Sequence, residues 1–170
     1  VEAGLSMDET VSIGPDDVAA TGNNRSRLSA GTEMSRGEMM RLALMSSENR
    51  AANALSRHYP GGAAAFVEAM NRKAQQLGLR DTRFVEPTGL SSDNRSSAKD
   101  LAVLVNEASR HELIRELSTA RDAQVAVGRQ QVQFRTTNRL VADPTWDIVL
   151  QKTGYISEAG RCLVMQAELA

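Results

Sequence analysis

Two short motifs in this chain combine residue types that can take part in acyl transfer. Ser47-Glu48-Asn49 offers a hydroxyl and an amide, and Lys152-Thr153-Gly154 offers an amine and a second hydroxyl beside a glycine. A serine hydroxyl acts as a nucleophile or a proton carrier only when a basic group lies within hydrogen-bonding reach. Because the motifs are far apart in sequence, only a fold that brings them together could use them.

Each motif alone also has an ordinary structural interpretation. Ser47 could be the N-cap of a helix, with Asn49 a surface residue in its first turn. Residues 152–154 could be a strand end with a turn glycine. The order and context of the motifs favour the chemical interpretation, because the first lies at a predicted helix junction and the second at the end of a predicted strand.

The elements that must position these motifs follow from hydrophobic spacing and helix caps. Helices are expected near residues 35–46, 48–58, 63–77, 97–109 and 112–117, the first of them opened by a Ser35–Glu38 capping box. Strands are expected near 123–127, 131–135, 146–153 and 161–169, the last two forming a hairpin. Residues 8–32 read as a polar, loop-rich stretch. Helices followed by strands predict an α+β fold, with a helical cluster packed on an antiparallel sheet.

Both ends of the printed sequence look cut from something longer. Residues 1–4 read like the last turn of a helix with Gly4 as its stop, and the strand near 161–169 stops where the chain stops. We therefore expect residues 1–170 to form a single partial domain.

Composition argues against several classes of function. The 170 residues carry a formal net charge of −1 with scattered Lys and Arg, which gives no reason to expect nucleic-acid binding. No apolar stretch approaches the roughly 18 residues of a membrane-spanning helix. The single cysteine, Cys162, can form neither an intrachain disulfide nor a CxxC zinc site, and we expect it to be buried in an apolar strand. No metal or other cofactor is expected.

Several longer segments resemble the D-alanyl-D-alanine carboxypeptidase family of penicillin-binding serine enzymes. The similarity includes residues 44–52, 84–90, 96–102, 136–140 and 152–160, and it extends from about Leu5 to Met165. Details such as the Ser-Ser-Glu-Asn-Arg-Ala string at 46–51 look closest to the low-molecular-mass endopeptidases of that family. The resemblance implies part of a transpeptidase fold of the penicillin-binding-protein and serine β-lactamase type.

The resemblance also implies catalytic roles. In the family, the nucleophilic serine and a lysine lie in a Ser-x-x-Lys helix. Ser47 would pass a proton toward the leaving amine, and Asn49 would hydrogen-bond that lysine and the substrate. Lys152 would supply the positive charge that favours serine ionisation.

Substrate binding is implied for the residues that follow Lys152. Thr153 would offer its hydroxyl to a substrate carboxylate, Gly154 would let the substrate backbone pair closely with the strand, and the Tyr155 N–H would donate to the oxyanion. The ligands implied are peptidoglycan stem peptides and β-lactam antibiotics, and the location implied is the periplasm. The reaction implied is cleavage of D-alanyl peptide bonds through an acyl-enzyme, with the balance of endopeptidase and carboxypeptidase activity left open.

The family's Ser-x-x-Lys motif should precede Leu5 by one helix, where only four residues are printed. The one such string in the chain, Ser96 to Lys99, coincides with a helix start, where Ser97 and Asp100 fit a capping box and Lys99 a solvated side chain. We therefore expect the printed chain not to be acylated. A longer enzyme, a second chain that carries the nucleophile, and an inactive wall-binding module remain open as explanations.

A class A β-lactamase is the alternative enzyme. It would need a deacylating glutamate between the second and third motifs, and Glu86-Pro87 superficially suits that role. The residues that follow, at 87–90, favour the peptidase.

Overall fold

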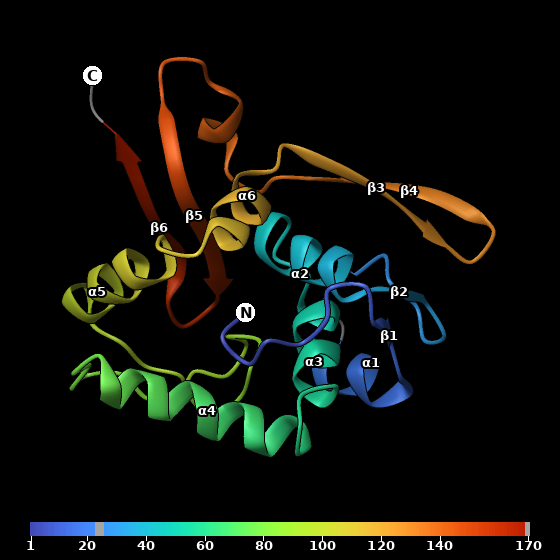
Figure 1. Cartoon of the computed structure of the whole chain (residues 1–170), viewed down its shortest axis with the longest axis horizontal. Coiled ribbons are helices and arrows are strands. Elements are labelled where there is room, and N and C mark those ends of the chain that lie inside the picture. Colours follow the sequence, from blue (N-terminus) through green and yellow to red (C-terminus); the bar gives the residue numbers. More distant parts are fainter. Residues whose placement is uncertain (23–25, 169–170) are drawn as a thin grey trace.

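The computed structural model describes residues 1–22 and 26–168. Figure 1 shows a group of helices with hairpins at two of its sides. In chain order the elements are β1 (Thr10–Ser12), α1 (Pro15–Thr21), β2 (Glu33–Ser35), α2 (Arg36–Met45), α3 (Asn49–Arg57), α4 (Gly62–Gln76), α5 (Ala98–Ala108), α6 (Glu112–Thr119), β3 (Asp122–Val127), β4 (Gln130–Arg135), the 3-10 helix η1 (Arg139–Ala142), β5 (Asp147–Ile156) and β6 (Gly160–Glu168).

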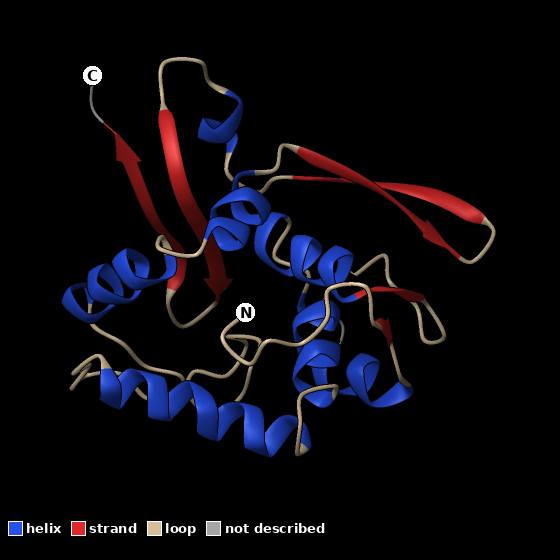
Figure 2. Ribbon diagram, viewed as in Figure 1, coloured by secondary structure: helices blue, strands red, loops and turns tan. Residues whose placement is uncertain are grey.

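The predicted α+β class is confirmed, but the strands do not form one sheet in the described part of the chain. They form three two-stranded antiparallel ladders, β1–β2, β3–β4 and β5–β6. Figure 2 shows the β3–β4 hairpin extending away from the helices, while β5 and β6 stand beside α5 and α6. The hairpins therefore lie at the sides of the helical group and do not form a single sheet beneath it.

Helix α2 is the centre of the core. Met39, Leu42 and Met45 are completely buried on it. Its start has the predicted capping box, since the Glu38 N–H donates to Ser35 Oγ and the Glu38 carboxylate accepts from the Ser35 N–H. The rest of the buried apolar cluster comes from both ends of the chain and includes Val11, Ile13, Leu28, Ala51, Ala54, Ala123, Val125 and Phe134. The C-terminus of α2, where Ser47 follows, is thus held by the best-packed region.

The N-terminal third is more structured than the sequence predicted. Residues 8–32 contain β1 and α1, whose strand and helix are only three and seven residues long and so leave little periodic signal. Residues 1–4 form a turn instead of a helix end, with the Gly4 N–H 3.0 Å from the Val1 carbonyl and Gly4 at φ +64°. The three-residue β2 was also absent from the prediction.

An ion pair between the buried Asp17 and the partly exposed Arg57 holds this third against α3. Asp17 is fully buried and accepts hydrogen bonds from the Arg57 guanidinium at 2.9 Å, the Asn53 amide at 2.9 Å and the Gly14 N–H at 2.7 Å. Arg57 also donates to the Ser12 carbonyl at 2.6 Å. These partners meet only in the folded chain, so the sequence pattern around Asp17 could not reveal them.

The β5–β6 hairpin that carries the second motif is confirmed. Lys152 lies opposite Val164 and Gly154 opposite Cys162, and β5 continues to Ile156 before the turn. The side chain of Gln151, fully buried, donates to the Ser118 carbonyl of α6 at 2.7 Å. Because side chains alternate along a strand, Lys152 points to the other face.

The expectation that Cys162 is buried was wrong. Its thiol is exposed, and the neighbouring Leu163 is 46 % exposed. Strand β6 pairs only with β5 among the described strands, so much of this part of the hairpin is left uncovered. An apolar run therefore does not imply burial here. No helix in the described ranges is long and apolar enough to cross a membrane.

Candidate active site

Ser47 lies in the tight connection between α2 and α3. The connection is closed by hydrogen bonds to the Leu42 carbonyl from the Ser46 and Glu48 N–H groups, both at 3.1 Å. Ser47 has φ 56°, in the left-handed region, and is the one described residue other than glycine with a positive φ. Such a conformation costs of order 1–3 kcal/mol and persists where the surrounding structure imposes it. The conformation of Ser47 is therefore a local cost to the stability of the fold, which the surrounding structure offsets.

Lys152 meets Ser47 directly. Its Nζ donates to Ser47 Oγ at 2.6 Å, across a separation of 105 residues, and also donates to the Thr153 carbonyl. No carboxylate in the described residues pairs with this amine. Burial lowers the pKa of Lys152 to about 8, so the ammonium gives up a proton more readily than an ordinary lysine. The predicted meeting of the two motifs is confirmed, and their catalytic roles remain predictions.

Asn49 is the first residue of α3 and is half-buried. Its side chain makes no hydrogen bond to the Ser47 or Lys152 side chain within the described residues, so its amide is available to an incoming group. Asn49 is therefore only two residues from Ser47 in the sequence, but no hydrogen bond connects its side chain to that of Ser47 or Lys152 in the described residues. Its predicted contacts to a lysine and to substrate therefore stay predictions.

The strand beyond Lys152 is open to solvent. Gly154 is exposed, and a side chain added to it would meet no atom within 4 Å. Tyr155 is 68 % exposed. An extended peptide can add to an exposed strand edge through main-chain hydrogen bonds. The open surface at 154–155 suits the substrate-binding role predicted for these residues.

Thr137 is a site residue to which the sequence interpretation gave no role. Its hydroxyl lies 2.6 Å from that of Thr153, and its N–H donates to the Met45 carbonyl at 3.1 Å. Residues 136–140 belong to the family-like segments, but a Thr-Thr-Asn string before a short helix reads as an ordinary cap. Asn138 does cap η1, by accepting from the Leu140 N–H at 3.1 Å.

The alternative Ser-x-x-Lys string is structural. Ser97 caps α5, since its side chain accepts from the Asp100 N–H at 3.2 Å. The reciprocal half of the predicted capping box is wrong, because the Asp100 carboxylate accepts from the Asp81 N–H and the Thr82 hydroxyl instead, both at 2.8 Å. Lys99 is exposed, as predicted, and in the described residues it makes no hydrogen bond to Ser96.

Glu86 organises its own loop. Its carboxylate accepts hydrogen bonds from Thr88, Gly89, Ser91 and Asn94. Burial by itself would raise the pKa of Glu86, but the hydrogen bonds from Thr88, Ser91 and Gly89 outweigh it and lower that pKa below its usual value. A carboxylate so occupied is a poor general base.

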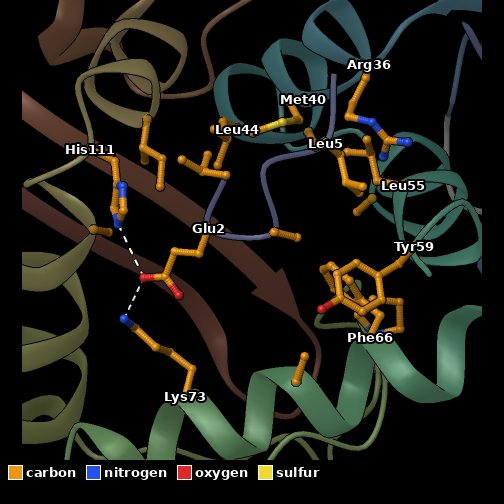
Figure 3. A pocket seen from close by; sticks show the side chains of 18 of the residues that line it. Glu2, Leu5, Arg36, Met40, Leu44, Leu55, Tyr59, Phe66, Lys73 and His111 are labelled. Carbon is orange, nitrogen blue, oxygen red and sulfur yellow. Dashed lines mark hydrogen bonds and ion pairs between the residues drawn. The ribbon is translucent and has the colours of Figure 1, made fainter. Parts of the chain in front are cut away.

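A cavity of about 440 Å³ lies between helices α2, α3, α4, α5 and α6. Figure 3 shows apolar side chains such as Leu5, Met40 and Phe66 around it, with Glu2, Lys73 and His111 at one end. Ser47 and Lys152 are not among the lining residues, although Leu44, on the preceding turn of α2, is. The cavity is therefore separate from the Ser47–Lys152 pair.

The acidic groups at the charged end of the cavity already form ion pairs with a lysine of the same chain. Glu2, Glu107 and His111 are placed closely enough to hold a metal ion. However, Lys73 Nζ lies 2.5 Å from Glu2 Oε1 and 2.9 Å from Glu107 Oε1. An ammonium group already satisfies both carboxylates, so we assign no metal centre to this cluster.

Comparison with known proteins identifies the family. A family model described as D-alanyl-D-alanine carboxypeptidase matches residues 2–169. The chain belongs to this family. Among curated members, it is 44% identical to the D-alanyl-D-alanine endopeptidase of Pseudomonas aeruginosa, over 99% of this chain and 55% of that relative. It is 45% identical to the D-alanyl-D-alanine endopeptidase of Escherichia coli, over 98% of this chain and 54% of that relative.

The chain thus spans about half the length of these D-alanyl-D-alanine carboxypeptidase family members. A solved Streptomyces DD-transpeptidase superposes with a TM-score of 0.86, covering 98% of this chain and 70% of that structure. At 24% sequence identity this likeness shows the fold. The predicted transpeptidase-type fold is confirmed.

Proposed function

We propose that the protein acts as a serine D,D-peptidase that cleaves D-alanyl peptide bonds of peptidoglycan through an acyl-enzyme, and that β-lactams acylate the same site. The observation that carries the proposal is the hydrogen bond from Lys152 Nζ to Ser47 Oγ, which joins two of the three motifs that such enzymes use. Membership of the D-alanyl-D-alanine carboxypeptidase family supports it.

In this mechanism a serine nucleophile passes its hydroxyl proton to the lysine of its own Ser-x-x-Lys segment as it attacks the carbonyl carbon of the D-alanyl peptide bond. The carbon–nitrogen bond then breaks, which leaves an acyl ester that water later hydrolyses, and the leaving amine needs a proton. Ser47 delivers that proton and is reprotonated by Lys152, whose pKa of about 8 suits exchange near neutral pH. The substrate backbone lies along β5 at Gly154, the Tyr155 N–H donates to the oxyanion, and Thr153 binds the carboxylate of the leaving amino acid.

The nucleophile is proposed to lie in a Ser-x-x-Lys segment outside the printed residues. The string at 96–99 is a helix cap, which removes the one candidate inside them. The apolar cavity between α2 and α6 supports this proposal, because it can receive the apolar face of another helix close to Ser47.

Endopeptidase rather than carboxypeptidase activity is the finer proposal. It is supported by the names of the relatives that share 44–45% identity with this chain. A site outside the cytoplasmic membrane, in the periplasm, follows from the location of the proposed substrate. β-Lactamase action is disfavoured, because the carboxylate of Glu86 is used by its own loop.

Intact-protein mass spectrometry after incubation with benzylpenicillin tests the proposal. The full-length protein should gain one penicillin adduct that persists, and the printed 170-residue chain should gain none. Full-length protein that gains no adduct and cleaves no D-alanyl bond of cross-linked stem peptides would contradict the proposed function. An adduct on the printed chain would show that the nucleophile lies within it, and Ser47 and Ser96 would be examined first.

A further inference from the structure

Thr137 connects the two motif segments from a third part of the chain. Its N–H donates to the carbonyl of Met45, two residues before Ser47, at 3.1 Å. Its hydroxyl lies 2.6 Å from the hydroxyl of Thr153, which directly follows Lys152. The Ser47–Lys152 bond is therefore accompanied by a second bridge between α2 and β5, and that bridge passes through Thr137.

The backbone of Thr137 is fixed on both sides. The Thr136 N–H donates to the Arg121 carbonyl at 2.9 Å, and Asn138 is buried and caps η1. The side chain of Thr137 itself lies at the exposed surface of the site. A fixed backbone with an exposed side chain places one hydroxyl accurately without burying it.

The protons of the two hydroxyls limit what the pair can do. Each threonine hydroxyl has one proton to donate and can accept from another group. If Thr153 donated to Thr137, it would have no proton left for an anion. If Thr137 donates, the proton of Thr153 is free, and accepting a hydrogen bond makes the Thr153 hydroxyl a stronger donor. The other acceptor near the Thr137 hydroxyl is the Met45 carbonyl, at a weaker 3.4 Å.

We propose that Thr137 is a positioning residue that donates to Thr153 and so directs the Thr153 proton at the carboxylate of the leaving amino acid. This inference rests on the proposed D,D-peptidase function. It makes Thr137 a determinant of specificity, because the benefit exists only for substrates that carry an anionic carboxylate next to the scissile amide. A neutral end group gains little from the oriented proton.

The test compares two peptides on the full-length protein. One is a D-alanyl peptide whose leaving amino acid carries a free α-carboxylate, as in a cross-linked stem peptide, and the other is the same peptide with that carboxylate converted to a carboxamide. Thr137→Val removes the hydroxyl at nearly constant shape, Thr137→Ala is a second variant without it, and Thr137→Ser keeps it. Thr153→Val and the double Thr137→Val/Thr153→Val variant complete a cycle that measures coupling between the two hydroxyls.

For the free acid, Thr137→Val and Thr137→Ala should lower kcat/KM about tenfold, mainly through KM, as expected for weakening a hydrogen bond to a charged group. The carboxamide should change less than about twofold, Thr137→Ser should restore the free-acid value, and the double variant should be no worse than Thr153→Val. Equal losses on both peptides, no loss on either, or losses that multiply in the double variant would overturn the inference. Unmodified protein that cleaves neither peptide and takes up no penicillin would overturn the proposed function as well.

Discussion

At the residue scale, Lys152 is a half-buried ammonium without an acidic partner in the described residues, and its partial burial lowers its pKa to about 8. Penicillin acylation of the full-length protein should slow as the pH rises through about 8, because Lys152 then loses the charge and proton that the mechanism uses. Rate constants measured across the neutral and alkaline range test this. Lys152→Arg, which stays protonated, should keep any residual activity independent of pH there. An unchanged alkaline limb in that variant would assign the titration to another group.

Ser47 combines a proposed role in proton transfer with an unfavourable backbone conformation, and two substitutions separate these two effects. Ser47→Ala and Ser47→Gly both remove the hydroxyl and should lower acylation about 10²–10⁴-fold, the usual contribution of a proton-transfer group. Only Ser47→Gly relieves the positive φ of 56°, so it should melt at a higher temperature than Ser47→Ala. If the two variants melted alike, the left-handed conformation would not be costing stability.

At the scale of elements, α1 is attached to α3 through the buried carboxylate of Asp17. Asp17→Ala should lower the free energy of unfolding by about 1–3 kcal/mol, because the Asn53 amide and the Gly14 N–H lose their acceptor while the partly exposed Arg57 can be solvated. Urea denaturation of the full-length protein measures this loss. Asp16→Ala, at the exposed neighbouring position, is the matched control and should change stability by less than about 0.5 kcal/mol. Similar losses in both variants would mean that the hydrogen bonds of Asp17 are not the reason.

The loop built on Glu86 separates the peptidase from the β-lactamase interpretation. Glu86→Gln should leave the lifetime of the penicillin adduct unchanged, since Glu86 serves its own loop rather than a hydrolytic water. It should lower the melting temperature, because the amide cannot accept all the hydrogen bonds that the carboxylate does. Mass spectrometry followed over time measures the lifetime. A much longer-lived adduct in the variant would identify Glu86 as a deacylating base.

The elements differ in how well the sequence could predict them. Helix α2 and the β5–β6 hairpin have caps, periodic apolar residues or a short turn, and all of these are local signals. The exposure of Cys162 and the formation of α1 depend on which surfaces other elements cover. Local sequence patterns therefore predicted both incorrectly. The Ser47–Lys152 contact was predictable only because the two motifs have a family precedent. The sequence offered no reason to assign Thr137 to the site, because its proposed role depends on contacts with Thr153 and Met45, which are distant in sequence.

For the whole molecule, the proposal that a further helix packs in the cavity between α2, α3, α4, α5 and α6 can be tested by filling that cavity. Ala69 lines this cavity, so Ala69→Leu would fill part of it. If a further helix packs there, the substitution should cost the full-length protein about 1–3 kcal/mol by overpacking and should slow acylation, while leaving the printed chain equally or more stable. Melting temperatures of both forms test this, with the exposed Ala64→Leu on α4 as control. A full-length protein indifferent to Ala69→Leu would leave the cavity without that role.

Cys162 gives the molecule a built-in place for an optical reporter. It is the only cysteine in the chain, it is exposed, and it faces Gly154 across the β5–β6 ladder. A maleimide dye on this thiol would sit one strand away from the proposed peptide-binding edge, without an engineered attachment point. Its emission would respond to local changes in polarity and mobility. Ligand occupancy could then be followed in solution in real time, including for peptides that are bound but never cleaved.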